Sequence, residues 1–456
     1  MGKEKKNKEE RVGLGTLLLW QSRAVSSSVT YLLISTFLMI YCTDALKMPA
    51  AVISAILVGS KFIDGVTDMV AGFIVDKTKT KWGKARPYEI FIIFMWLFTW
   101  LLFSCPESLS TAFKCVWIFV MYALVNSICN TFLNANNAPY LVRAFKDTQI
   151  VKLTSLGSIF TMLTGLIFNI FFPMAMGKIA VDAAGWSRLV LMMAVPLAVI
   201  GILRMLFVEE KYDVDSANTN ASEQLKVKDV FKLFKVNKYI VLITLVNFVF
   251  NFVCNINVSS YYYKYIVGNV GAMGLASAAT IVAIPMAFAF PPLIKKFSTS
   301  KLMMAGFFVA AAGYLLNFFA KDNIPLLMIG AILTGGGAVP ASILLTLVII
   351  DCADYNEWKG MYRMEGTMSS VVGLGKKIGS AIGAGALGVF LQFSGYTGDA
   401  ATMPSSAIVM IRLLMSFIPM ALYVITGLSM ITYKLDKKLP QIKAELEEKR
   451  RLSNEE

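Results

Sequence analysis

The sequence predicts an all-α polytopic membrane protein with twelve transmembrane helices in two six-helix bundles. Of its 456 residues, 57% are hydrophobic and 16% are charged, and the mean hydropathy is +0.64. A soluble protein carries about 25% charged residues, so the composition indicates a chain that lies largely in lipid. The spacing of the apolar segments and the placement of the basic residues support the same fold class.

Twelve apolar segments are each long enough to cross about 30 Å of hydrocarbon as a helix. One polar linker, residues 209–237, divides them into two sets of six. We therefore expect an N-terminal bundle over residues 1–208, a C-terminal bundle over residues 238–433 and a tail over residues 434–456. The predicted segments cover residues 16–42, 49–75, 88–105, 113–135, 150–174, 187–208, 238–263, 273–294, 302–320, 324–350, 367–393 and 407–433.

Lysine and arginine gather on one side of this predicted layout. With both termini inside, about 31 of the 43 basic residues fall in inside-facing segments and about 6 in outside-facing loops. Such an asymmetry follows the positive-inside rule and predicts a multi-pass protein of the inner or plasma membrane with cytoplasmic termini. It also explains the formal net charge of +14 by attraction to anionic lipid, so we expect no nucleic-acid partner.

The sequence offers little for enzymatic chemistry. It has no histidine, and its six cysteines are scattered without a Cys-x-x-Cys pair. Because neither a nucleophile–base pair nor a metal-ligand cluster stands out, we expect neither an enzyme nor a resident cofactor. Histidine is the side chain that usually changes charge near neutral pH. Any proton coupling must therefore use carboxylates.

Two carboxylates, Asp64 and Asp68, interrupt the second apolar segment. At a spacing of four residues they share one face of a helix. Each costs about 2.5–3.5 kcal/mol near the centre of a bilayer, so the helix needs something to offset them. A bound cation, a shared proton or Lys61 would do this. A structural salt bridge among these three residues is the alternative.

Asparagines form a polar stripe in each half of the chain, at four-residue spacing. One stripe is Asn126, Asn130 and Asn134, and the other is Asn247, Asn251 and Asn255. Amides in hydrocarbon are costly unless they are paired or face water. The stripes therefore line a shared aqueous cavity suited to a hydroxyl-rich solute, or they form hydrogen bonds that join helices.

Three blocks of sequence resemble the glycoside-pentoside-hexuronide:cation symporters, a family with the major facilitator superfamily fold. The blocks are KFIDGVTDMVAGFIVDKTKTKWGKARPY from Lys61, NNAPYLVRAFKD from Asn136, and DYNEWKGMYRMEGTMSSVVGLGKKIGSAIGAGALGVFLQFSGY from Asp354. They occur in the family's order and span both halves. The resemblance implies cation-coupled symport of a sugar, namely a glycoside, oligosaccharide, pentoside or hexuronide, by alternating access.

The resemblance also implies site residues. Asp64 and Asp68 match the positions that hold the coupling cation, with Thr67 and Asn134 as neighbouring oxygen donors for Na⁺, Li⁺ or H⁺. Lys377 matches an intramembrane lysine that would neutralise the acidic pair without the cation. The predicted substrate contacts are Ser28, Tyr31, Asn130, Asn137, Asn251, Asn255 and Lys377.

The predicted sugar site departs from the pattern of the galactoside-transporting members. Ser28 stands at an acidic position of the first helix, Asn137 at an acidic position of the fourth, and Gly157 where an arginine is expected. Galactoside specificity is therefore not expected. Arg23, on the first helix, either binds an anionic group of the substrate or extends its charge to the cytoplasmic edge, and we favour the second.

Mixed charges at the predicted membrane edge suggest gates. In the first half, Asp76 and Arg86 flank a basic loop. Pairing of Asp76 with an arginine or lysine of a neighbouring element would hold the outward-facing state and would break on inward opening. The predicted gating residues of the second half are Asp354, Arg363 and Glu365.

Two further segments bear on the fold. Glycines crowd the eleventh apolar segment, among them Gly375, Gly379 and Gly383, and this pattern predicts close helix packing. The tail from Lys434 can form a charged helix, which we expect to be solvated.

We therefore expect a monomeric sugar symporter. A transporter of lipid or another amphiphile, or a non-transporting membrane sensor, is the alternative on the same scaffold. Retention of both aspartates and Lys377 argues against the sensor.

Overall fold

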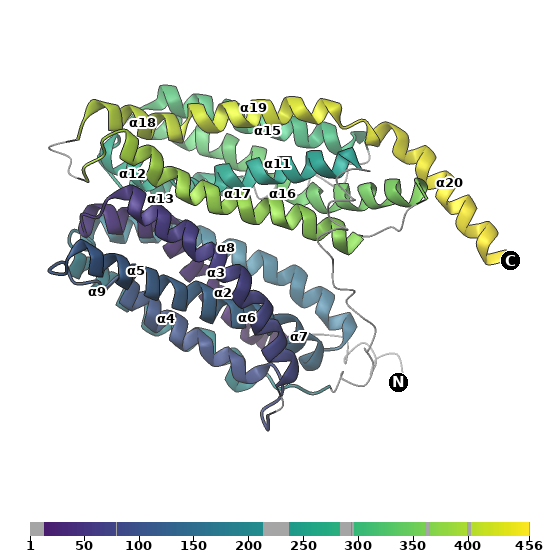
Figure 1. Ribbon diagram of the computed structural model, residues 1–456, viewed down its shortest axis with the longest axis horizontal. Helices are drawn as coiled ribbons and strands as arrows, with labels where there is room; N and C mark the ends of the chain where they lie inside the picture. Colours follow the sequence, from purple (N-terminus) through teal and green to yellow (C-terminus); the bar gives the residue numbers. More distant parts are fainter. Residues whose placement is uncertain are drawn as a thin grey trace. The chain divides into compact units, whose positions relative to one another are not determined.

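The computed structural model describes residues 13–78, 80–212, 237–282, 293, 296–360, 365–398 and 403–455; some helical side chains in these ranges, including those of Asp68 and Asp76, lie outside the description. The described residues are almost entirely helical (Figure 1). Their contacts define two compact units. Unit 1 comprises Met1–Asn220, Asn269–Gly274 and Leu391–Pro404, and unit 2 comprises Ala221–Gly268, Leu275–Phe390 and Ser405–Glu456.

Unit 1 is built from helices that run back and forth along the N-terminal half of the chain. They are α2 (Leu14–Ile40), η1 (Tyr41–Ala45), α3 (Ala50–Lys77), η2 (Arg86–Ile90), α4 (Phe91–Leu102), α5 (Thr111–Ala123), η3 (Leu124–Asn130), α6 (Thr131–Ala135), α7 (Asn137–Ala144), α8 (Asp147–Ile179) and α9 (Ala183–Phe207). Both η1 and η3 are π-helical. Such segments are rare and occur often at functional sites.

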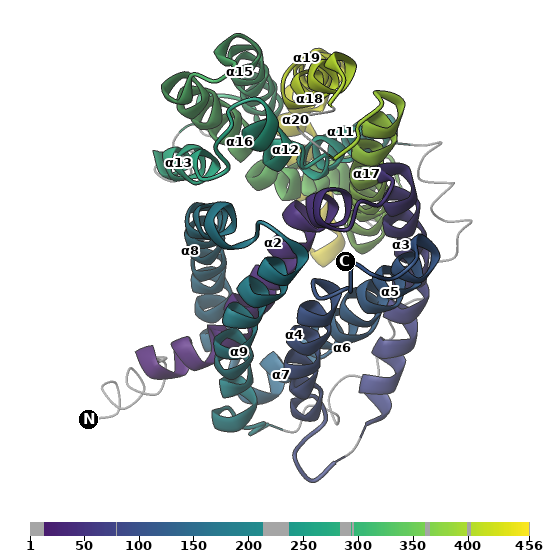
Figure 2. The ribbon, with the colours of Figure 1, turned by 90° about the vertical axis from the view of Figure 1, so that its left-hand side faces the viewer.

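Small side chains bring α2, α4 and α9 close together, and α2 and α9 lie side by side in Figure 2. A Cβ added at Gly201 of α9 would come within 2.5 Å of Ile92 and 2.8 Å of the Ser26 hydroxyl. That hydroxyl donates to the Leu197 carbonyl at 2.7 Å and accepts from the Trp96 indole at 2.7 Å. Interhelical hydrogen bonds and small residues of this kind hold membrane helices together without help from water.

Unit 2 repeats the layout with long helices. They are α11 (Lys238–Asn255), α12 (Ser259–Tyr265), most of α13 (Ala272–Ala279), η4 (Thr280–Val282), α15 (Thr299–Ala320), α16 (Ile324–Trp358), α17 (Glu365–Phe393), α18 (Ser405–Met415), α19 (Phe417–Ser429), η5 (Met430–Thr432) and α20 (Leu435–Glu455). Its core is continuous from α11 through α15, α16 and α19 to α20.

The glycines of α17 confirm the predicted close packing. A Cβ at Gly379 would lie 2.3 Å from the Phe248 carbonyl oxygen of α11, and one at Gly383 would lie 2.4 Å from the Phe252 carbonyl oxygen. Both contacts are too short for any side chain, so only glycine lets the two backbones approach this closely.

The tail forms the helix α20, which extends beyond α19 (Figure 1). Leu435, Ile442 and Leu446 are buried in the core of unit 2. Because these three positions put apolar side chains on one face of the helix, α20 packs against the unit. The expectation of a solvated tail is wrong for that face.

Nine helices of the described residues are long and apolar enough to cross a membrane. Two of the twelve predicted segments are not among the nine. One, α4, has 12 residues; the other, α3, has 28 residues, but several of its side chains after Lys61 lie outside the description. A third, residues 273–294, lies mostly outside the described residues.

Candidate cation and substrate sites

Asp64 lies in the middle of α3, where two donors contact its carboxylate. The Ser127 hydroxyl of η3 donates to Oδ1 in a short hydrogen bond, and the Lys61 ammonium donates to Oδ2 at 3.2 Å. Ser127 is 1% exposed, while the Lys61 side chain is 39% exposed. The Lys61 ammonium also lies 6.0 Å from the centre of the Tyr122 ring. The Lys61–Asp64 contact of the alternative, a salt bridge among Lys61, Asp64 and Asp68, is therefore present, and the part of Asp68 lies outside the description.

The other predicted cation ligands lie on α3 and on α6. Thr67 donates its hydroxyl to backbone carbonyls of its own helix, at 3.1 and 3.2 Å, which leaves its oxygen lone pairs available to a cation. The exposed Asn134 donates to the Asn130 side chain at 3.3 Å. Asp68 lies one turn after Asp64 on α3, but its side chain is outside the description. The full ligand set stays a prediction.

The π-helical turn η3 changes the register of the first asparagine stripe. The Asn126 side chain donates to the Tyr122 carbonyl at 3.4 Å, and the Asn126 backbone carbonyl accepts from the Thr131 side-chain hydroxyl at 3.3 Å; the segment between them is π-helical. The i, i+4 pattern of Asn126 and Asn130 therefore does not continue as one α-helical face. Instead, Ser127 is directed at α3.

The predicted substrate contacts on α2 are accessible to different degrees. Ser28 is half-buried and donates to the Val25 carbonyl of its own helix at 2.9 Å. Tyr31 is 56% exposed. Gln21, by contrast, packs against α8, where it donates to the Leu153 carbonyl at 2.9 Å and occupies the space beside Gly157. Gln21 therefore occupies the space next to position 157, where the family pattern has an arginine.

Arg23 does not reach for the membrane edge. Its side chain is 7% exposed and donates to the Leu133 carbonyl at 3.1 Å and to the Asn137 side chain at 2.8 Å. Its Nε lies 3.8 Å from a carboxylate oxygen of Glu89. The favoured expectation of an extended Arg23 is therefore wrong, because buried acceptors offset its charge locally.

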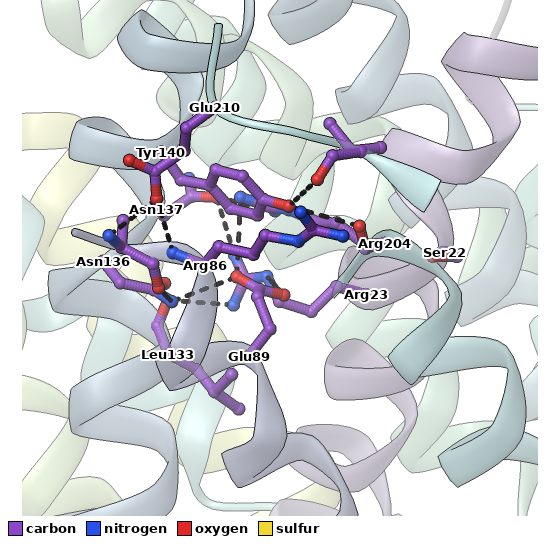
Figure 3. Close-up of polar contacts among 12 residues, drawn as sticks. Ser22, Arg23, Arg86, Glu89, Leu133, Asn136, Asn137, Tyr140, Arg204 and Glu210 are labelled. Atoms are coloured by element: carbon purple, nitrogen blue, oxygen red, sulfur yellow. Dashed lines mark hydrogen bonds and ion pairs between the residues drawn. The ribbon is translucent and has the colours of Figure 1, made fainter. Parts of the chain in front are cut away.

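Arg23, Glu89 and Arg204 form what we call the Glu89 cluster (Figure 3). Arg204 is 1% exposed, and its NH2 lies 3.6 Å from Glu89, which is fully buried. The Arg204 NH1 donates to the Asn137 oxygen at 3.0 Å, and Asn136 donates to Glu89 at 3.1 Å. The Asn137 oxygen thus accepts hydrogen bonds from both arginines and links them within the cluster. Its predicted contact with sugar stays a prediction.

Aromatic rings complete the surroundings of Arg204. The centre of the Trp20 ring lies 3.4 Å from the guanidinium carbon, and that of Tyr140 lies 4.7 Å away. The faces of aromatic rings attract cations, most strongly where water is excluded. The cluster contains two arginines and one glutamate, and the rings and the amide offset part of the second positive charge.

Arg86 lies next to the Glu89 cluster and joins the basic loop to the end of α9. Its Nε donates to the Met205 carbonyl at 2.7 Å and its NH2 to the Leu206 carbonyl at 3.1 Å. Glu210 accepts from the backbone amides of Lys84, Ala85 and Arg86. These bonds fix the loop within unit 1. The predicted gating role of Arg86 is not tested by them.

In unit 2 the second asparagine stripe forms hydrogen bonds between and within helices. Asn247 donates to the Val372 carbonyl of α17 at 2.9 Å. Asn251 donates to Asn247, and Asn255 donates to the Asn251 carbonyl at 2.8 Å and to Ser380 at 3.2 Å. These contacts favour the interpretation that the stripe joins α11 to α17. Sugar contacts at Asn251 and Asn255 stay predictions.

Asp354 belongs to a second charged group, which we call the Lys443 cluster. The Lys443 ammonium of α20 lies 3.2 Å from Asp351 and 3.8 Å from Asp354, both near the end of α16. Of the other predicted residues in unit 2, Lys377 is exposed on α17. Arg363 and the side chain of Glu365 lie outside the described residues, as does that of Asp76 in unit 1.

Sequence reasoning missed several residues of these sites. Glu89 and Arg204 could have been noticed as charges at the ends of apolar segments, since such charges need partners. Ser127 gave no signal, because a serine in a membrane helix usually bonds its own backbone and the π-helical turn could not be foreseen. Lys443 was concealed in a tail of mixed charge.

The chain is similar in sequence and in fold to known transport proteins. The family described as MFS/sugar transport protein matches residues 22–437. The isoprimeverose transporter of Lactiplantibacillus pentosus is 26% identical, over 94% of this chain and 90% of that protein. The glucuronide carrier protein homolog of Escherichia coli is 22% identical, over 94% and 95%. The crystal structure of a D-xylose-proton symporter superposes with a TM-score of 0.63 at 12% identity, covering 93% of this chain and 98% of that one.

Proposed function

This chain belongs to the family described as MFS/sugar transport protein, and we propose that it is a cation-coupled sugar symporter. It would work by alternating access. Relatives named as transporters of isoprimeverose and of glucuronide support a sugar substrate. Membership of a family of transport proteins supports transport over catalysis.

The proposed substrate is an uncharged glycoside, oligosaccharide or pentoside. Arg23 is the cation of α2 that would bind a hexuronide carboxylate, yet it is buried and already contacts Asn137 and Glu89. A carboxylate would have to displace these partners and compete with Glu89 for the same guanidinium, which is costly in a low dielectric. The exposed Tyr31 and the half-buried Ser28 and Asn130 offer the polar groups that hydroxyls need.

The proposed coupling site centres on Asp64, with Asp68, Thr67 and Asn134 as further ligands. The observation that carries it is the Asp64 carboxylate, held inside a helix of apolar sequence and contacted by a cationic side chain and a hydroxyl. A carboxylate in that place favours the binding of a positive ion. Na⁺, Li⁺ and H⁺ are the candidates, and Lys377 is the proposed counter-charge of unit 2.

The proposed location is the inner or plasma membrane, with both termini in the cytoplasm. The excess of basic residues in alternate loops supports this orientation. In it, Arg86, Asp76, Asp354, Arg363 and Glu365 lie on the cytoplasmic side, where they would act as gates. We propose a monomer as the transporting unit.

Sugar uptake into membrane vesicles tests the proposal. Na⁺, Li⁺ and proton gradients are imposed in turn, and accumulation of a panel of sugars is compared with exchange across the membrane at equal cation concentration. Asp64→Asn should reduce cation-driven accumulation at least tenfold and leave sugar exchange in place, because the amide cannot supply the charge that couples the two fluxes.

The matched control is Asp182→Asn. Asp182 caps the start of α9 through its bond to the Gly185 amide, and asparagine caps equally well. Cation-driven accumulation that survives in Asp64→Asn would refute the site, and uptake of every tested sugar without any cation dependence would refute symport.

A further inference from the structure

Both oxygens of the Asp64 carboxylate face a protein donor. Ser127 donates to Oδ1 and Lys61 donates to Oδ2. Each carboxylate oxygen has two lone pairs, and each donor occupies one of them. A metal cation that binds here therefore shares the carboxylate with both donors, and the positive charge of Lys61 opposes its binding.

The two donors respond differently to an arriving cation. An ammonium group has three donors and no lone pair, so Lys61 has no means of coordinating a metal ion and repels it. A hydroxyl has one donor and two lone pairs, so Ser127 can rotate and present its oxygen. The ring of Tyr122, 6.0 Å from the Lys61 ammonium, gives the displaced charge a nearby favourable surface.

The position of Ser127 is set by η3. This π-helical segment, Leu124–Asn130, packs against α3, and Ser127 is buried there at 1% exposure. Ser60, one residue before Lys61, is equally buried, but its hydroxyl donates to the Leu57 carbonyl of its own helix. The contrast shows that Ser127 is directed across the helix interface rather than along its own backbone.

We propose that Lys61 is a tethered cation that occupies Asp64 until Na⁺ or Li⁺ displaces it, and that Ser127 is a positioning residue whose oxygen then turns to the bound ion. This inference rests on the proposed coupling site at Asp64. The new element is Lys61, which lies on the same helix three residues before Asp64. By competing with the metal cation for this carboxylate, it sets the cation affinity of the transporter.

The proposal predicts opposite effects for the two residues. Lys61→Met removes the competitor, so cation affinity should rise about fivefold, as expected for a partly exposed ion pair. Ser127→Ala removes an oxygen ligand and leaves Asp64 without its hydroxyl partner, so affinity should fall about tenfold. Lys61→Arg retains the positive charge and Ser127→Thr retains the hydroxyl, and both should stay near the wild-type affinity.

The test is a titration of the purified full-length chain with NaCl or LiCl in the absence of sugar, at constant pH and ionic strength. Choline chloride replaces the metal salt. Binding is followed by the shift of the thermal unfolding midpoint and by tryptophan fluorescence. Lys77→Met, on the exposed end of α3, and Ser60→Ala are the matched controls and should leave affinity unchanged.

If Lys61→Met binds the metal cation no more tightly than the wild type, while Lys61→Arg is folded and has wild-type affinity, the proposed competition by Lys61 is wrong. Ser127→Ala with wild-type affinity would overturn the role of Ser127. If the wild type binds neither Na⁺ nor Li⁺, the inference is wrong, whereas proton-driven sugar uptake in vesicles would leave the proposed symport intact. Loss of all cation-driven uptake would instead remove the proposed function itself.

Discussion

The two units each contain a buried charged group near the end of a long helix, but the two groups are built differently. In the Glu89 cluster of unit 1, every charged side chain is at most 7% exposed. In the Lys443 cluster of unit 2, the aspartates are at most 9% exposed, while the lysine is 48% exposed. One group is sealed inside its unit and the other is open to solvent on its cationic side.

The two clusters also differ in which helices supply the positive charges that pair with their carboxylates. The partners of Glu89 come from α2, α9 and the segment around Asn136, so removing any of them disrupts the interior. Lys443, a partner of both Asp351 and Asp354, comes from the terminal helix α20, which packs its apolar face against unit 2. Unit 1 therefore uses charge for rigidity, and unit 2 uses it to attach a peripheral helix.

The largest effect is expected from Glu89→Gln. This change leaves Arg23 and Arg204 buried without a carboxylate, and breaking a buried charge pair costs about 3–5 kcal/mol. The yield of folded protein in detergent and its thermal unfolding midpoint should both fall strongly. Both quantities are measured with the wild type in parallel.

A double variant sharpens this expectation. Glu89→Gln combined with Arg204→Met removes one uncompensated charge as well as the carboxylate, so part of the lost stability should return. If Glu89→Gln has the same thermal unfolding midpoint as the wild type, the Glu89 cluster does not stabilise the fold as proposed.

A much smaller effect is expected from Lys443→Ala. Its ion pairs are half-exposed and screened by solvent, so the change should cost no more than about 1 kcal/mol. Thermal unfolding and the rate of trypsin cleavage within α20 report it, and Lys437→Ala, at an exposed position of the same helix, is the control. Destabilisation as large as that of Glu89→Gln would abolish the distinction between the two clusters.

The fold was largely predictable because hydropathy dictates it. Twenty apolar residues in a row must become a helix in lipid, where every backbone group needs an internal partner. Glycine spacing predicted that α17 packs closely against another helix. The structure identifies that helix as α11, where Gly379 and Gly383 fit against backbone carbonyls.

The site was less predictable, because its contacts depend on tertiary geometry. Asp64 and Lys61 are three residues apart on one helix, so their pairing could be anticipated. The contact of Ser127 with Asp64 depends on the π-helical turn η3. No periodic pattern in the sequence predicts this turn. Arg23 was misjudged because Glu89 and Asn137, its partners, are distant in sequence.

The smallest effect is expected from the pH dependence of α20 docking. The Trp358 indole donates to Glu445 at 2.5 Å and Gln441 donates to it at 2.7 Å. These two bonds lower the pKa of the Glu445 carboxyl from its ordinary value, with the indole as the larger cause. Because the pKa is lower in the docked state than in the separated one, the bond favours docking above the ordinary glutamate pKa of about 4.3. This contribution is lost as the pH falls through the lowered value.

Hydrogen exchange of the α20 amides, measured against pH, tests this directly. The protection factor, which corrects for the slower intrinsic exchange of amides at lower pH, should fall on acidification in the wild type. Trp358→Phe should remove the part of this pH dependence that belongs to Glu445 while leaving the lysine contacts of α20 in place. The difference between the two curves isolates the contribution of Glu445, because every other carboxylate is the same in both proteins. A helix that docks more tightly in acid, or a Trp358→Phe curve that coincides with the wild type, would contradict the role of Glu445.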